Sequence, residues 1–204
     1  MYNPAHFALS EDEAWRALAR AGLVSLVATG PTGLVSALVP TLAEAPSALH
    51  AHVARANPFW REAGEGAEVL ALAVLADGYI SPRDYPSTRE NPAAVPTWNY
   101  VAIEVHGQLH LHEEDEWVES CVRRLAERFE AGRDDAWRVA EAPEEYLARM
   151  RRAVVGLEIQ VRQIEGKAKY SQNRSAQDVA GMRAALASGS LAQRALAEEI
   201  ARWS

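Results

Sequence analysis

Two pairs of histidines stand two residues apart in apolar segments, His50 with His52 and His110 with His112. Residues i and i+2 of a strand point to the same face, so each pair presents two imidazoles together. Such a pair is half of a metal site, which a carboxylate or a third histidine must complete. The sequence has no such ligand at a motif spacing, so we expect half-exposed strand residues and no metal.

A candidate anion site lies in the segment HVARANPFW, where Arg55 and Asn57 stand in a turn that follows a strand. A guanidinium, an amide and the backbone N–H groups of a turn can converge on one phosphate. The alternative is a surface arginine in an ordinary turn.

A second group of donors lies in the segment GKAKYSQN. Lys167 and Lys169 are the only lysines among 21 basic residues, and an extended backbone places both on one face. Ser171 and Gln172 add neutral donors. The segment therefore predicts one of two things. It is either a binding site that uses the compact ammonium of lysine in preference to the planar guanidinium of arginine, or a solvated basic turn.

The segment VPTWNYVAIEVHG places two aromatics around an amide at the start of a strand. Trp98 and Tyr100 share one strand face, and Asn99 points to the other. They are core residues, or else they border a planar ligand whose ring oxygens and nitrogens bond to the amide.

The sequence excludes several classes of protein. It has no G-x-S-x-G, P-loop or G-x-G-x-x-G motif, and the single cysteine, Cys121, favours neither a disulfide nor a thiolate metal site. The net charge of −7 makes direct DNA binding doubtful, because phosphate neutralisation requires clustered basic residues. Neither a membrane span nor a basic leader is visible, so we expect a cytoplasmic protein.

Hydrophobic periodicity predicts mainly β structure with added helices. We expect strands at 23–29, 34–42, 48–53, 68–80, 97–111 and 157–161, and an irregular loop at 81–96. We expect helices after Ser10, over 118–129, from Pro143, and after Ser175 and Ser190. Close spacing without strand–helix alternation favours an antiparallel barrel over a doubly wound sheet. A single domain 1–204 would comprise an N-terminal arm and helix (1–22), a helical insertion (113–153) and C-terminal helices (175–204).

Six motifs, in order, resemble the PaiB family of FMN-binding negative transcriptional regulators. They are MYNPAHF, HVARANPFW, YISPRDYPS, VPTWNYVAIEVHG, VVGLEI and GKAKYSQNRS. The resemblance implies an FMN-binding split β-barrel similar to pyridoxamine-phosphate oxidase, in a homodimer with flavin near the subunit interface.

The resemblance also implies a set of cofactor-binding residues. They are Leu38, Val39, Pro40, His52, Val53, Arg55, Asn57, Trp98, Asn99, Tyr100, Lys167, Lys169, Ser171 and Gln172. Two positions depart from the family pattern, because Leu38 stands where members often carry histidine and Thr88 where they often carry lysine.

Three functions are compatible with this resemblance. The first is a flavin-binding regulator that acts indirectly, since the chain is acidic and lacks a basic recognition helix. The second is an FMN-dependent oxidoreductase or flavin reductase that uses NAD(P)H and a small acceptor, in which the flavin supplies the chemistry and no catalytic residue is identifiable. The third, which draws on the histidines, is a haem-binding or haem-degrading barrel.

Overall fold

The computed structural model describes residues 1–203, and Ser204 lies outside the described residues. The chain forms two compact units. Unit 1 contains residues 1–20, 74–104 and 165–204, and unit 2 contains residues 21–73 and 105–164. Three long strands, β5 (Glu68–Ile80), β6 (Thr97–His112) and β7 (Val154–Lys169), contribute residues to both units.

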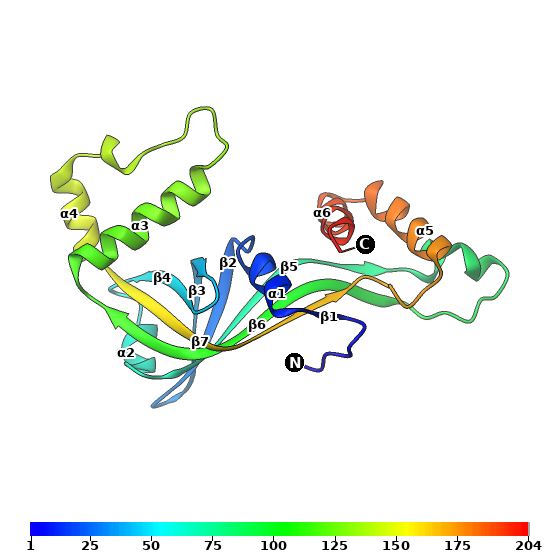
Figure 1. Ribbon diagram of the computed structural model, residues 1–204, viewed down its shortest axis with the longest axis horizontal. Helices are drawn as coiled ribbons and strands as arrows, with labels where there is room; N and C mark the ends of the chain where they lie inside the picture. The colour runs from blue at the N-terminus through cyan, green and yellow to red at the C-terminus, as the bar shows by residue number, and fades with distance from the viewer. Residues whose placement is uncertain (204) are drawn as a thin grey trace. The chain divides into compact units, whose positions relative to one another are not determined.

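The strands close into a barrel. In addition to β5, β6 and β7, the sheet contains β2 (Leu23–Gly30), β3 (Gly33–Glu44) and β4 (Ala48–Ala54). Their order is β7-β4-β3-β2-β5-β6. The last strand, β6, also pairs with the first, β7, which completes a six-stranded ring (Figure 1). The short strand β1 (Ala8–Leu9) adds to β7 at residues 166–167. The prediction of a barrel with added helices is confirmed.

Alternate residues of the barrel strands in unit 2 are buried, as small-barrel packing requires. They include Val24, Leu26 and Ala28 of β2, Ala37 and Val39 of β3, Leu49, Ala51 and Val53 of β4, and Val155, Leu157 and Ile159 of β7. Gly107 of β6 lies where a side chain would not fit, since a Cβ atom there would come 2.5 Å from the carbonyl oxygen of Gln160. The glycine therefore permits the close approach of β6 to β7.

Helices α2 (Phe59–Ala63), α3 (Asp115–Glu130) and α4 (Glu144–Arg152) belong to unit 2, with a 3₁₀ turn η3 (Val139–Glu141) before α4. Helix α3 contacts β3, β4 and α4 (Figure 1). Its Cys121 packs with Leu42 and Leu125. Burial raises the pKa of the Cys121 thiol to about 12, so this cysteine is an inert core residue at neutral pH.

Unit 1 contains the N-terminal arm, α1 (Glu11–Leu18), the two 3₁₀ turns η1 (Pro82–Asp84) and η2 (Pro86–Arg89), α5 (Ala176–Ala187) and α6 (Leu191–Ala201). Helices α5 and α6, orange and red in Figure 1, lie side by side. Their core consists of Ile80, Tyr85, Met182, Leu186, Leu196 and Ile200. Ser10 and Ser190 cap α1 and α6 through capping boxes, as the sequence predicts.

Three local predictions were incomplete. The segment 81–96 is not wholly irregular, because Ser81 accepts from the backbone N–H of Arg83 and so caps η1. Helix α2 was not expected; the side chain of Asn57 accepts from the backbone N–H of Phe59 and stabilises its first turn. Strand β7 continues eight residues beyond the predicted end at 161, to Lys169, because β1 supplies a partner at 166–167.

No helix within residues 1–203 is long and apolar enough to cross a membrane.

Candidate functional site

Lys167 is a buried cation near the end of β7, with 7% of its surface exposed. Its Nζ donates to the backbone carbonyl of Tyr2 at 2.8 Å. The same ammonium lies 5.7, 5.9 and 5.3 Å from the ring centroids of Tyr2, Phe7 and Tyr100. Three aromatic faces therefore surround a charge that burial would otherwise make costly.

Lys169 follows on the same side of β7, and its Nζ donates to the hydroxyl of Thr97 at 2.7 Å. We call the side chains of Lys167 and Lys169 the lysine face. Within residues 1–203, each ammonium has one hydrogen-bond acceptor and neither has a carboxylate partner. Since an ammonium has three donors, the lysine face retains capacity for an anionic group.

Two carboxylates beside the N-terminal arm, those of Glu104 and Glu165, form ion pairs with the N-terminal ammonium. The ammonium of Met1 lies 2.7 Å from the carboxylate of Glu104 and 3.1 Å from that of Glu165. These contacts raise the pKa of the N-terminal amine, chiefly through the hydrogen bonds to Glu104 and Glu165. The N-terminal ammonium is thus shared between two carboxylates.

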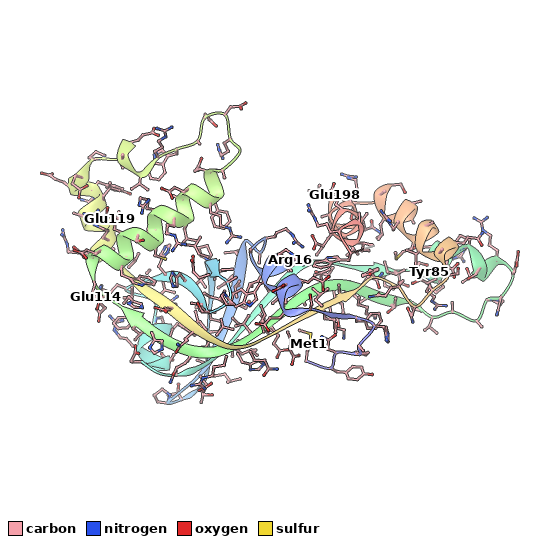
Figure 2. The ribbon with its side chains drawn as sticks, viewed as in Figure 1. Met1, Arg16, Tyr85, Glu114, Glu119 and Glu198 are labelled. Atoms are coloured by element: carbon pink, nitrogen blue, oxygen red, sulfur yellow. The ribbon has the colours of Figure 1, made fainter. Side chains whose placement is uncertain are left out.

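Asn99 and Ser171, two predicted ligands, lie in a buried polar network instead of on the lysine face. The Asn99 amide donates to the Ser171 hydroxyl at 3.1 Å and to the Met182 sulfur at 3.1 Å. The Ser171 hydroxyl also lies 2.8 Å from the phenol oxygen of Tyr85, the residue labelled beside α5 in Figure 2. Ser171 has a φ of 65°, which this network maintains. In this conformation, both side chains fasten the strand end to α5.

Gln172 is likewise engaged in holding the end of β7. Its amide donates to the carbonyls of His6 and Ala168, and its carbonyl accepts from the backbone N–H of Tyr170. The contact with His6 joins the arm to the strand end, and the other two close a local turn at that end. Gln172 therefore supports the segment that carries the lysine face.

Trp98 and Tyr100 lie on the opposite side of β6 from Asn99, as the strand periodicity predicts. Tyr100 contacts the lysine face through its ring, while the indole N–H of Trp98 donates to Asp77 at 2.9 Å. The Trp98 ring also meets Tyr79 edge-on and is half exposed. The two aromatics thus flank a surface that a planar molecule could cover.

In unit 2, the structure gives Arg55 contacts that the sequence did not reveal. Its Nε donates to the carbonyl of Arg152 at 2.9 Å, and one Nη donates to the carbonyl of Val154 at 3.2 Å. The other Nη bonds to the carboxylate of Glu113. Arg55 therefore joins β4 to the α4–β7 junction, and Glu113 already balances its charge. Of the two predicted anion sites, the lysine face is the better candidate.

The remaining predicted residues of unit 2 divide by strand face. Val39 and Val53 point into the barrel and can offer only backbone groups to a ligand, whereas Leu38 is 64% exposed and Pro40 is half-buried. His52 lies on the outer face of β4 and lines a cavity beside α3 and α4.

The histidine pairs point outward, as expected. His110 bonds to Glu65 at 2.8 Å, and His112 bonds to Glu158 at the same distance and stacks on Trp117 with ring centroids 4.2 Å apart. Burial lowers the pKa of His50. Among the described residues, no group of three histidine, cysteine or acidic side chains could hold a metal ion.

Sequence reasoning missed the partners of the lysine face. Tyr2 and Phe7 of MYNPAHF surround Lys167, and Thr97 accepts from Lys169. The pair of aromatic residues in this short arm was the available signal. The position of these two rings beside Lys167 depends on the pairing of β1 with β7, which joins residues more than 150 positions apart.

The donor set fits FMN. Its phosphate is a dianion that charge-assisted hydrogen bonds stabilise, and its isoalloxazine ring is planar and carries carbonyl oxygens. A lysine pair without carboxylate partners within residues 1–203 matches the first requirement, and exposed Trp98 beside half-buried Tyr100 matches the second.

Comparison with known proteins is consistent with this chemistry. A family model described as "Putative FMN-binding domain" matches residues 1–163, so the lysine face lies just beyond the match. The "Protease synthase and sporulation protein PAI 2" of Bacillus subtilis is 35% identical over 127 residues, 62% of this chain and 58% of that protein. An uncharacterised protein of Aspergillus fumigatus is 26% identical over 174 residues, 67% of this chain and 65% of that protein. This chain thus spans less than two thirds of the length of either relative. The predicted resemblance to the PaiB family is confirmed by the family model and by the Bacillus subtilis relative.

Solved structures agree on the fold. The flavocytochrome Anf3 of Azotobacter vinelandii has a TM-score of 0.61 at 13% identity, over 86% of this chain and 75% of that one. The FAD- and haem-binding protein of Mycobacterium smegmatis has a TM-score of 0.57 at 17% identity, over 84% and 77%. At these identities the likeness concerns the fold alone, which is the predicted split barrel.

Proposed function

The chain belongs to this family of FMN-binding domains, and on that premise we propose that it binds FMN with its lysine face and acts as a flavin-dependent regulator of the PaiB type. The observation that carries the proposal is the buried Lys167 ammonium, which has no carboxylate partner within residues 1–203. A buried cation of this kind favours an anionic ligand, because the ligand supplies the missing countercharge.

Each residue of the proposed site has a distinct part. Lys167 and Lys169 hold the phosphate or a ring carbonyl, Trp98 and Tyr100 border the ring, and Gln172 holds the strand end that carries the lysines. When bound, FMN supplies reversible one- and two-electron redox chemistry. The protein supplies position and charge.

The regulatory part of the proposal rests on the PAI 2 relative, whose name associates it with protease synthesis and sporulation. With a net charge of −7, this chain is poorly suited to bind DNA itself. We therefore propose indirect regulation through another protein or through the redox state of the flavin. Equal, salt-sensitive affinity for its own upstream DNA and for random duplex would be expected; tight sequence-specific binding would contradict the indirect mechanism.

A homodimer is also part of the proposal. The outward face of β2, β3 and β5 exposes Leu23, Leu38 and Leu72, with 54%, 64% and 38% of their surface accessible. Leu38 and Leu72 both pair with Ser25 across the sheet, so these leucines form one apolar patch. A second copy of the chain would bury it symmetrically. Leu38→Glu is expected to convert a dimer to a monomer in sedimentation, whereas Leu191→Glu on the exposed start of α6 leaves the mass unchanged.

FMN titration of the purified protein, followed by flavin fluorescence and solution mass, tests cofactor binding directly. Saturation at one FMN per subunit is expected, and failure to saturate would overturn the site. NAD(P)H oxidation by the FMN-loaded protein, with a range of small acceptors, then separates the functions. Turnover would assign an oxidoreductase in place of a regulator.

The haem alternative has less support. The cavity lined by His52 has a volume of about 200 Å³. Pockets for drug-sized ligands begin at about 300 Å³, and haem is larger than most such ligands. His52 in this conformation therefore does not offer a haem site.

A further inference from the structure

Unit 2 contains a cavity that FMN binding does not explain. It has a volume of about 200 Å³ and lies between β4, α3, η3, α4 and the start of β7. Its lining is predominantly apolar, with Val122, Val139, Leu147, Met150 and Val154. Helix α4 has no fully buried residue, so its apolar side is incompletely covered. The space is therefore a preformed apolar site on the outside of the barrel.

One polar group in the lining lacks a partner. The Nδ1 atom of His52 is buried and has no hydrogen bond within the described residues. Burial lowers the pKa of His52, so its imidazole is neutral at pH 7 and has one donor and one acceptor nitrogen. A buried nitrogen without a partner costs free energy. Nδ1 has no accessible surface in this conformation, so a ligand with one polar group recovers that cost when the imidazole turns to present Nδ1 to the cavity.

The charges of the cavity are already balanced. Arg151 lies 3.4 Å from Glu119, the α3 residue labelled in Figure 2, and 2.6 Å from Glu144. Arg123 pairs with Glu127 at 3.0 Å. Each arginine thus has a carboxylate, so a charged ligand would break an ion pair to find its own partner. An uncharged ligand would break none.

We propose that this cavity binds a neutral, single-ring apolar molecule that carries one hydrogen-bonding oxygen, such as an alkylphenol, with His52 as its polar contact. A dry cavity of about 150 Å³ holds benzene in another protein, so about 200 Å³ accommodates a substituted ring. This inference is independent of the proposed FMN site, since it uses none of the lysine-face residues.

Titration with four ring compounds tests the proposal: 4-ethylphenol, ethylbenzene, benzoate and benzylamine. Calorimetry and the ring ¹⁵N resonances of His52 report binding. We expect saturable binding of 4-ethylphenol with a shift of the His52 nitrogens, weaker binding of ethylbenzene, and none of the charged compounds. Absence of 4-ethylphenol binding at millimolar concentration, or preferential binding of benzoate or benzylamine, would overturn the proposal.

Two variants separate the polar contact from the cavity itself. His52→Phe keeps a ring but removes both nitrogens, and a neutral hydrogen bond accounts for about 2- to 10-fold in affinity. It should bind 4-ethylphenol only as well as it binds ethylbenzene, whereas unchanged preference for the phenol would refute the role of His52. Val122→Phe fills the cavity and should abolish binding of both compounds.

Thermal unfolding of both variants and FMN titration of Val122→Phe provide the controls. Retained cooperative unfolding shows that a loss of phenol binding is local. FMN affinity should be unchanged in Val122→Phe, and 4-ethylphenol should not compete with FMN. Competition would place His52 in the flavin site and would overturn the assignment of a separate cavity, while leaving the proposed function intact.

Discussion

Substitution of Lys167 by methionine should weaken FMN binding strongly while changing the stability of the flavin-free protein little. Methionine keeps most of the apolar stem of lysine and removes the ammonium. The two measurements separate a ligand-binding lysine from a structural one, because a structural lysine would lose stability first.

The magnitudes follow from the surroundings of Lys167. Three aromatic rings near 5.3 to 5.9 Å each contribute about 0.5 kcal/mol at the weak end of cation–π interactions. The hydrogen bond to the Tyr2 carbonyl contributes about 1.5–3 kcal/mol because the donor is charged. Burial of the ammonium costs several kcal/mol, which is of similar size and opposite sign. The net change on substitution is therefore about 1 kcal/mol or less, or roughly 2–4 °C in Tm for a chain of this size.

The Lys167→Met substitution should change the affinity for FMN far more than it changes the unfolding free energy. Loss of one charge-assisted hydrogen bond of about 1.5–3 kcal/mol corresponds to about a 10- to 150-fold higher Kd. Urea unfolding by circular dichroism, with and without FMN, and fluorescence titration measure both quantities. Arg83→Met, an exposed charge of the same unit, is the matched control and should change neither. A fall in stability above about 3 kcal/mol with unchanged FMN affinity would refute the reasoning.

Three further predictions concern structural residues. Arg55→Met should lower the unfolding free energy by about 1–3 kcal/mol and leave the FMN affinity within about twofold, since its hydrogen bonds join protein segments; a tenfold loss of affinity in titration would contradict this. Gly107→Ala should cost at least about 1–3 kcal/mol in urea unfolding, because the new methyl lies 2.5 Å from a backbone carbonyl oxygen, whereas Gly22→Ala meets no atom within 4 Å and should be neutral. Hydrogen bonds from Ser87 hold the pKa of Asp178 below its usual 3.8, so its stabilisation is present at neutral pH and is lost as the pH falls through the lowered pKa; Asp178→Asn should flatten the acid limb of the stability curve, and an unchanged limb would count against it.

The barrel was predictable because its determinants are local. Alternation in β2 and β4 placed Val24, Leu26, Leu49 and Val53 on one face of their strands, and these residues are buried. The capping box at Ser10 likewise placed the start of α1 correctly. Each of these signals lies within a few residues of the structure that it determines.

The partners of the site residues were not predictable, because they come from distant segments. The strand period placed Asn99 opposite Trp98 and Tyr100 correctly. However, it could not reveal that the hydroxyl of Ser171, 72 positions away, accepts a hydrogen bond from the Asn99 amide. The sequence HVARANPFW is similarly compatible with two roles for Arg55, a ligand of a phosphate or a structural arginine. The position of Glu113 decided between them, 58 residues further along the chain.

The distinction between Arg55 and Lys167 depends on countercharge and not on the type of cation. A cation that already faces a carboxylate gains little from an anionic ligand, because the two anions compete for the same donors and repel each other. A buried cation with only neutral acceptors and aromatic faces gains the full interaction. Arg55 has Glu113, whereas within residues 1–203 Lys167 has the Tyr2 carbonyl and three rings. Lys169 adds a second ammonium without a carboxylate partner within residues 1–203 on the same strand face, so a dianion such as a phosphate suits the lysine face better than a single carboxylate would.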